Sequence, residues 1–307
     1  MIQTLLLAAA LLTAPIVHAA SGEAIMTCDA KWHDAVRDRD VPVRIRMPAG
    51  TGRVPVILFS HGLGGSLDGG TNWAVAWAKA GFIVVNLQHP GSDRSIIGSG
   101  RIAAAMAPAQ LVARVDDVHF VLDRLGRRPR EGVCDLRRAD LAHIGMSGHS
   151  FGAHTTQAIA GQRFPIAGIA ADPRIKAAIA FSPSPPMRGS DAVAFGGIAI
   201  PFFSITGTED AVPIVPNIKP KDRERPFRAM PPGGKYLLVL AGANHMMFNA
   251  QDGLRDPAST ATPHIRDTVV AATTLFWRAT LLGDTLAGAA LVRFGATPPS
   301  DDRFEHK

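Results

Sequence analysis

The segment LAHIGMSGHSFG, residues 141–152, decides the fold of this 307-residue chain. Its first half, 141–146, is an apolar run typical of a buried strand, and a helix is predicted from Phe151 onward. Between them lies GHSFG, and a Gly-x-Ser-x-Gly motif between a strand and a helix predicts a nucleophile elbow. Its glycines permit a sharp turn, which would expose the Ser150 hydroxyl beside a helix N-terminus that favours developing negative charge. An ordinary N-capping turn is the competing interpretation.

Strand and helix patterns alternate on both sides of this motif. Apolar runs predict strands, and the segments between them predict helices. The alternation indicates an α/β protein with a mainly parallel sheet and helices on both faces. No linker rich in proline and glycine divides the pattern, so residues 20–307 are expected to form one domain. The predicted strands are 41–47, 54–59, 82–87, 141–146, 175–181, 198–205 and 236–240, and the predicted helices are 72–79, 108–125, 264–282 and one that begins at 151.

The composition and short motifs exclude several classes of protein. With 47% hydrophobic and 19% charged residues, the chain is not intrinsically disordered. The net charge is +6, but the densest basic cluster, between Lys219 and Arg228, is interleaved with Asp222 and Glu224. We therefore predict a solvated loop there and no nucleic-acid surface. The sequence has no dinucleotide fingerprint, no Walker lysine and no His-Glu-x-x-His motif, so no cofactor and no metal is expected.

The N-terminus resembles a secretory signal. Residues 5–17 are apolar, and Val17-His18-Ala19 fits a cleavage site, which predicts a signal peptide over 1–19. The apolar run is shorter than the ~20 residues of a membrane-spanning helix, so no stable membrane insertion is expected. The mature chain is therefore expected to be secreted or periplasmic, where Cys28 and Cys134 could form a disulfide.

Three further motifs follow predicted strands. SHGLGG at 60–65 is expected to line an oxyanion hole, with the backbone N–H groups of Leu63 and Phe151 as donors. TGTED at 206–210 offers Glu209 or Asp210 as the carboxylate that orients a histidine, although an acidic turn is the simpler interpretation of this motif alone. GANHM at 242–246 carries His245. The order serine, acid, histidine is that of the α/β-hydrolases.

Other histidines compete with His245 for the role of base. His149 lies inside the elbow and cannot swing onto the oxygen of its neighbour. His61 and His89 each follow a predicted strand, on the edge that carries the motifs, and are expected to line the substrate pocket. Met246 follows the candidate base and is expected on the apolar wall of that pocket, with core packing as the alternative.

These motifs together resemble those of secreted serine hydrolases of the α/β-hydrolase superfamily. The group it most resembles is the one known as predicted dienelactone hydrolases, which is related to the plasma-type platelet-activating factor acetylhydrolases. True dienelactone hydrolases have a cysteine nucleophile where this chain has Ser150, so dienelactone is not carried over as the substrate. The resemblance is carried by residues 35–43, 60–65, 89–93, 114–117, 120–123, 148–152, 206–210 and 242–245.

The resemblance implies hydrolysis of a carboxylic ester without a cofactor. It implies Ser150 as nucleophile and His245 as base, and it places the acid at the last position of Thr-Gly-Thr-x-Asp, which is Asp210 here. Segments 91–107 and 211–235 are the ones expected to cover the site, and the proline-rich second segment is expected to be irregular.

The segment 182–197 is too short for a helical lid domain, which favours a small-molecule ester with a short or accessible acyl group. The alternatives are a hydrolase of polyesters or cutin, a peptidase or acyltransferase of the same superfamily, and a non-catalytic binding protein on this fold.

Overall fold

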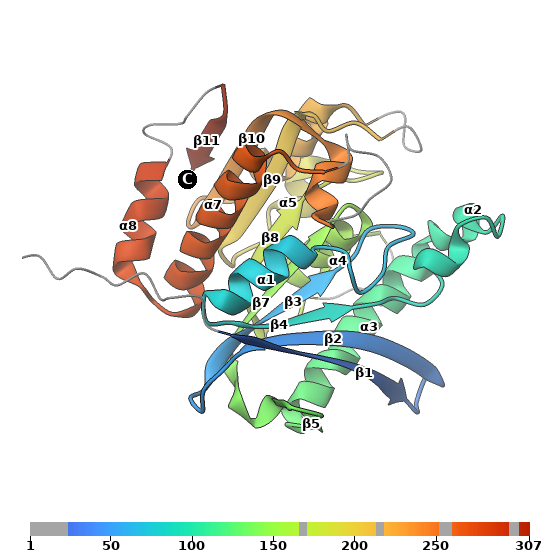
Figure 1. Cartoon of the computed structure of the whole chain (residues 1–307). Helices are drawn as coiled ribbons and strands as arrows, with labels where there is room; N and C mark the ends of the chain where they lie inside the picture. Colours follow the sequence, from blue (N-terminus) through green and yellow to red (C-terminus); the bar gives the residue numbers. More distant parts are fainter. Residues whose placement is uncertain (1–23, 166–170, 213–217, 252–259, 295–300) are drawn as a thin grey trace, which may run out of the picture.

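The computed structural model describes residues 24–165, 171–212, 218–251, 260–294 and 301–307 (Figure 1). The predicted signal peptide, residues 1–19, lies outside the described residues. Among the described residues, no helix has the length and apolar character needed to cross a membrane.

The strands of the main sheet alternate with the helices along the chain. They are β1 (Ile25–Asp34), β2 (Arg39–Pro48), β3 (Val54–Ser60), β4 (Ile83–Leu87), β7 (Ala139–His149), β8 (Ile175–Phe181), β9 (Phe202–Glu209), β10 (Lys235–Asn244) and β11 (Arg303–His306). They form a nine-stranded sheet in the order β1-β2-β4-β3-β7-β8-β9-β10-β11. The strands from β4 to β10 are parallel, while β1, β2 and β11 pair antiparallel at the edges. The predicted mainly parallel sheet is therefore confirmed.

Helices cover both faces of this sheet (Figure 1). On one face lie α1 (Thr71–Lys79) and α7 (Pro263–Leu281), with α8 (Thr285–Phe294) packed on α7. On the other lie α3 (Pro108–Gly126), α4 (Phe151–Ala160) and the short α5 (Asp191–Phe195). Because side chains of a strand alternate between faces, β3 buries Ile57 and Phe59 against the first group and Val56 and Leu58 against the second. A strand buried on both faces is continuously apolar, as predicted for this run.

Several parts of the chain differ from the sequence prediction. The strand predicted over 198–205 begins only at Phe202, because Pro201 has no N–H to donate to a neighbouring strand. Ile198 is buried in the cluster that includes α5 and does not belong to the strand. The edge strands β1 and β11 and the helix α8 were not predicted. The segment 211–235, expected to be irregular, contains a 3₁₀ helix at Pro220–Glu224 and α6 (Arg225–Ala229).

A disulfide joins Cys28 to Cys134, the pair that the sequence suggested. Cys28 lies on the edge strand β1, and Cys134 belongs to a small ribbon of β5 (Arg130–Glu131) and β6 (Cys134–Asp135). The bond therefore ties the N-terminal hairpin to the segment that follows α3. Cys134 is fully buried, against the core on the α3 face of the sheet.

Candidate active site

Ser150 occupies a strained turn between β7 and α4. Its backbone has φ 56° and ψ −114°, a region that residues other than glycine rarely adopt. The Ser150 N–H donates to the Phe181 carbonyl at the end of β8, 3.0 Å away. The side chain is thereby held at the carboxyl edge of the parallel strands, at the N-terminus of α4.

The two motif glycines permit the close contact on which this turn depends. A Cβ at Gly152 would lie 1.8 Å from the Ser60 carbonyl oxygen, and one at Gly148 would lie 2.4 Å from the Gly152 carbonyl oxygen. The start of α4 thus rests directly on the backbone at the end of β3. No side chain fits between them, which is the physical reason for glycine at both positions.

Three strand ends bring together the predicted serine, histidine and acid. The Nε2 atom of His245 lies 2.9 Å from Ser150 Oγ, and its Nδ1 atom lies 2.7 Å from Asp210 Oδ1. Ser150 follows β7, Asp210 follows β9 and His245 follows β10. Glu209, the alternative acid, is exposed, so its neighbour is the one in contact with the histidine.

Asp210 is buried and held on both sides. Its Oδ2 accepts a hydrogen bond from Thr206 Oγ1 at 2.7 Å, and Arg223 Nε lies 2.9 Å from Oδ1. Burial raises the pKa of the Asp210 carboxyl, but the hydrogen bond with His245 and the charge of Arg223 outweigh it, so the pKa lies below its ordinary value. The acid is therefore ionised at neutral pH.

Arg223 is a site residue that the sequence did not identify. Only 2% of it is exposed, and its guanidinium also donates to the carbonyl oxygens of Asp210 and Ser182. The predicted solvated loop is wrong at this position, whereas Lys219 and Lys221 in the same cluster are exposed. Its spacing in the sequence carries no signal of this role, since Arg223 stands among other basic residues.

The loop 60–65, in which the sequence suggests an oxyanion donor, lies against the elbow. A Cβ at Gly62 would be 3.4 Å from Ser150 Cβ, so this loop passes close to the serine. The Gly64 N–H donates to the Ser92 carbonyl at 2.9 Å and is not available to a substrate. In the part of the chain that the structure describes, no backbone carbonyl accepts a hydrogen bond from the Leu63 or Phe151 N–H.

His61 and His89 do not line the substrate pocket, which corrects their predicted role. They are only 1% and 0% exposed. The His61 ring contacts the Gly62 carbonyl and the His89 N–H, and the His89 ring lies between Ser60 and Asp117. The burial of polar groups requires such partners, so both rings belong to the supporting structure.

His149 also supports the site. Its Nε2 lies 2.9 Å from the His245 carbonyl oxygen, to which it donates. Burial lowers the pKa of His149 well below its usual value, so the ring stays neutral at neutral pH. It thereby holds the backbone of the residue that faces Ser150.

Two cavities flank the elbow. One of about 480 Å³ is lined by Ser150, His245 and Met246 and by parts of the segment 91–107. Met246 is 42% exposed and lies on the wall of this cavity. A second, more apolar cavity of about 390 Å³ lies beside Phe151 and His154. Within the described ranges, no group of three or more His, Cys, Asp or Glu side chains is arranged to hold a metal ion.

The order of the strands, the helices on both faces and the elbow after β7 define the α/β-hydrolase fold. Comparison with solved structures agrees: the chain is similar to a ferulic acid esterase from Streptomyces cinnamoneus, with a TM-score of 0.60 and 19% identity, over 86% of this chain and 92% of that one. At this identity the likeness shows the fold alone. No protein-family model and no curated protein matches the sequence.

Proposed function

We propose that this protein is a serine-dependent carboxylic ester hydrolase that works through an acyl-enzyme. The observation that carries the proposal is the continuous hydrogen-bonded line from Asp210 through His245 to Ser150 on the elbow. These distances are those required of an acid, a base and a nucleophile that act together.

In the proposed reaction, Ser150 Oγ attacks the ester carbonyl carbon while His245 Nε2 takes the hydroxyl proton. Asp210 fixes the ring with its proton on Nδ1 and stabilises the charged imidazolium that forms. His245 then gives the proton to the departing alkoxide. A water molecule, activated in turn by His245, releases the acid product and regenerates the serine.

The negative charge on the carbonyl oxygen of the tetrahedral intermediate is assigned to the N–H groups of Leu63 and Phe151. They belong to the two segments that meet at the Gly152–Ser60 contact. Loss of a single donor of this kind typically lowers kcat by about 10²–10³.

The proposed substrate is a small-molecule ester with a short or accessible acyl group. The segment 182–197, where a helical lid could lie, contains only α5, a helix of five residues. Met246 contributes an apolar side chain to the wall of the cavity at Ser150. The proposed location is secreted or periplasmic, which is compatible with the Cys28–Cys134 disulfide.

A matched pair of variants tests the assignment. Asp210→Asn keeps the shape but favours the wrong histidine tautomer, a change that costs about 10⁴ in kcat in a serine protease. Glu209→Gln removes an exposed charge one residue away and should cost less than about twofold. Both are measured on one short p-nitrophenyl ester, and a crippled Glu209→Gln with a normal Asp210→Asn would refute the assignment.

Covalent labelling separates catalysis from binding. A serine-directed phosphonate should label Ser150 in the wild-type protein and not in Ser150→Ala. Failure to label would favour a binding protein on this fold. Release of product from a polyester film faster than from short p-nitrophenyl esters would favour the polymer as the substrate.

A further inference from the structure

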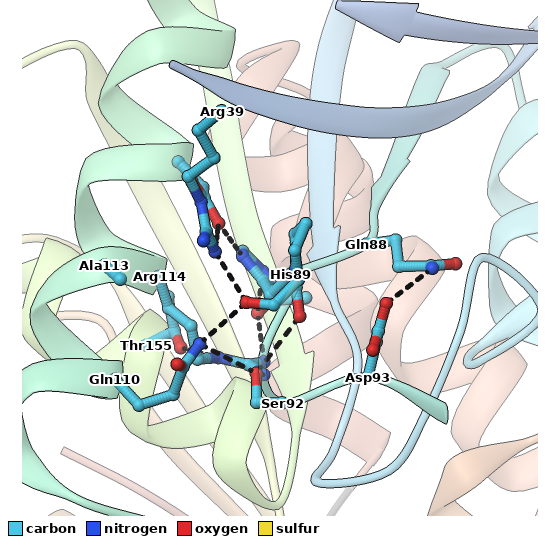
Figure 2. A network of polar contacts seen from close by, with 12 residues as sticks. Arg39, Gln88, His89, Ser92, Asp93, Gln110, Ala113, Arg114 and Thr155 are labelled. Carbon is cyan, nitrogen blue, oxygen red and sulfur yellow. Dashed lines mark hydrogen bonds and ion pairs between the residues drawn. The ribbon is translucent and has the colours of Figure 1, made fainter. Parts of the chain in front are cut away.

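A buried polar cluster contacts the loop 60–65, and Figure 2 shows its members His89, Ser92, Arg114 and Thr155. At its centre is Arg114 on α3, which is 0% exposed. The residues around it come from the ends of β3 and β4, from α3 and from the first turns of α4. The proposed reaction uses none of their side chains.

The Arg114 guanidinium donates only to uncharged oxygens. Its Nε donates to Thr155 Oγ1 at 3.0 Å and its Nη1 to Ser92 Oγ at 2.9 Å. Its Nη2 donates to Ser60 Oγ at 2.9 Å and also to the His61 carbonyl. The group is thereby fixed from three sides.

The ion pairs of the cluster do not include Arg114. Two other arginines pair with its carboxylates: Arg37 bonds both Asp34 and Asp117, and Arg39 bonds Asp117. No ion pair joins Arg114 directly to a carboxylate of any described residue. Among these three arginines, Arg114 is therefore the one whose guanidinium has no carboxylate in direct contact.

A chain of hydrogen bonds, in which each donor and acceptor is determined, links Asp117 through His89 and Ser60 to Arg114. The Asp117 carboxylate only accepts, so His89 Nδ1 carries a proton and donates to it at 3.0 Å. His89 Nε2 then accepts from the Ser60 hydroxyl at 2.9 Å, and that oxygen accepts from Arg114. Burial lowers the pKa of His89 to about 4, so this neutral state persists at neutral pH.

A second line runs from His89 to the oxyanion loop. The His89 backbone N–H donates to His61 Nε2 at 3.0 Å, so the proton of His61 is on Nδ1 and is donated to the Gly62 carbonyl at 2.6 Å. In a trans peptide the carbonyl and the following N–H point in opposite directions. Holding the Gly62 carbonyl therefore fixes the direction of the Leu63 N–H.

Arg114 also touches the other side of the hole. Its guanidinium carbon lies 4.5 Å from the centre of the Phe151 ring, in a cation–π contact. One buried cation thus contacts both segments that carry the proposed donors: the carbonyl of His61 on one side and the ring of Phe151 on the other.

We propose that Arg114 is a positioning residue of the oxyanion hole, whose buried positive charge stabilises the negative charge that develops on the substrate oxygen. The inference rests on the proposed ester hydrolysis. The charge of Arg114 acts through the two donor segments, in a water-excluded site where a fixed charge acts more strongly than in water. Because the surrounding hydrogen bonds hold it before the reaction, no reorganisation is needed when the oxyanion forms.

The chain offers a closely matched control. Arg46 is also buried, at 4% exposed, and its guanidinium donates to the uncharged oxygens of Asn86 and Thr71. Replacing either arginine with glutamine removes a buried cation of the same kind. Only Arg114 contacts the oxyanion loop and Phe151, so only its loss should act on the transition state.

The experiment measures kcat, KM, the free energy of unfolding and the inhibition constant of a trifluoromethyl ketone, whose adduct with the serine carries an oxyanion. For Arg114→Gln we expect kcat to fall about 10- to 100-fold with KM changed less than about twofold, and the inhibitor to weaken by the same factor as kcat. Arg114→Lys keeps the charge but loses the fork of donors, so it should recover part of the loss. Arg46→Gln should leave both constants near wild type.

Equal losses in the lysine and glutamine variants, or a fall in kcat without weaker inhibition, would overturn the proposal. If Arg114→Gln does not fold, Thr155→Val removes one acceptor of the guanidinium and should weaken inhibition and kcat together by about 3- to 10-fold. An unchanged Thr155→Val then counts against it. If the proposed function itself is wrong, the wild-type protein will bind neither the phosphonate nor the ketone, which distinguishes that outcome from the ones above. That result would refute this inference as well.

Discussion

Replacing Gly152 with alanine should disrupt both the fold and the site. The added Cβ would lie 1.8 Å from the Ser60 carbonyl oxygen and 2.9 Å from that of His61. A carbon needs about 3.3 Å from such an oxygen, so α4 and the end of β3 must separate by about 1.5 Å. The obstacle is backbone, which cannot rotate away as a side chain would.

The expected cost follows from that displacement. Overpacking against side chains typically costs about 1–3 kcal/mol, so a clash with backbone should lower the free energy of unfolding by more than about 3 kcal/mol. The same displacement separates Ser150 from the oxyanion loop, and a misplacement of ~1 Å can cost ~10²-fold in rate. The folded fraction should therefore be nearly inactive as well as unstable.

Gly288 in α8 is the control for the same substitution. The nearest atom to a Cβ there is Ala279 Cβ at 3.7 Å, an ordinary contact. In a helix interior, alanine is favoured over glycine by about 0.5–1 kcal/mol. Gly288→Ala should therefore be neutral or stabilising and fully active.

Urea unfolding followed by tryptophan fluorescence, with hydrolysis of a short ester on the same samples, measures both effects. Trp73, Trp77 and Trp277 are buried in the core and report its loss. A Gly152→Ala protein with wild-type stability and activity would show that the close contact between α4 and β3 does not exist.

Three further outcomes are expected. Reduction of the disulfide should lower the free energy of unfolding of the wild type by up to about 5 kcal/mol and leave that of a Cys28→Ala/Cys134→Ala protein unchanged. Urea titrations with and without dithiothreitol measure this, and an equal response of the two proteins would count against the bond. Burial raises the pKa of Asp117, but its hydrogen bonds with His89 and Arg39 lower it by more. The carboxylate therefore stabilises the fold above pH ~4, and this contribution is lost as the pH falls towards the pKa of the folded state. The free energy of unfolding of Asp117→Asn should be lower than that of the wild type at pH 7 and should change less between pH 2 and 5. Rates on p-nitrophenyl esters should fall from C4 to C16 and be unaffected by EDTA, and a steady rise with chain length would exclude the proposed acyl preference.

The elements that could be predicted are those whose buried positions are marked by a regular pattern of apolar residues in the sequence. The strand β3 and helix α3 have apolar residues at the spacing their packing requires, and the structure places them where expected. The strand β1 was missed although its residues alternate: Met26, Cys28 and Ala30 are partly buried against the core and Trp32 is buried, whereas the polar residues between them are exposed. Most of its apolar residues are not β-branched, so the local signal for a strand is weak, and pairing with β2 stabilises it.

The site shows the same division. Ser150 and His245 stand in short motifs after apolar strands, so the elbow and the order of the chain were enough to find them. His61 and His89 were placed at the correct edge of the sheet but on the wrong side of the loop, since spacing does not say which way a side chain turns. Arg114 and Arg223 contact the site only through the folded chain, from helical segments that are distant in sequence.

The Cys28–Cys134 bond divides the site along the chain. The loop it closes contains Leu63 and Arg114, whereas Ser150, Phe151 and the residues that activate the serine lie beyond it. Residues 97–104 inside that loop are exposed, so a protease could cut there. A single nick would release no fragment, because both pieces remain covalently joined: the protein would migrate as one band on a non-reducing gel and as two after reduction.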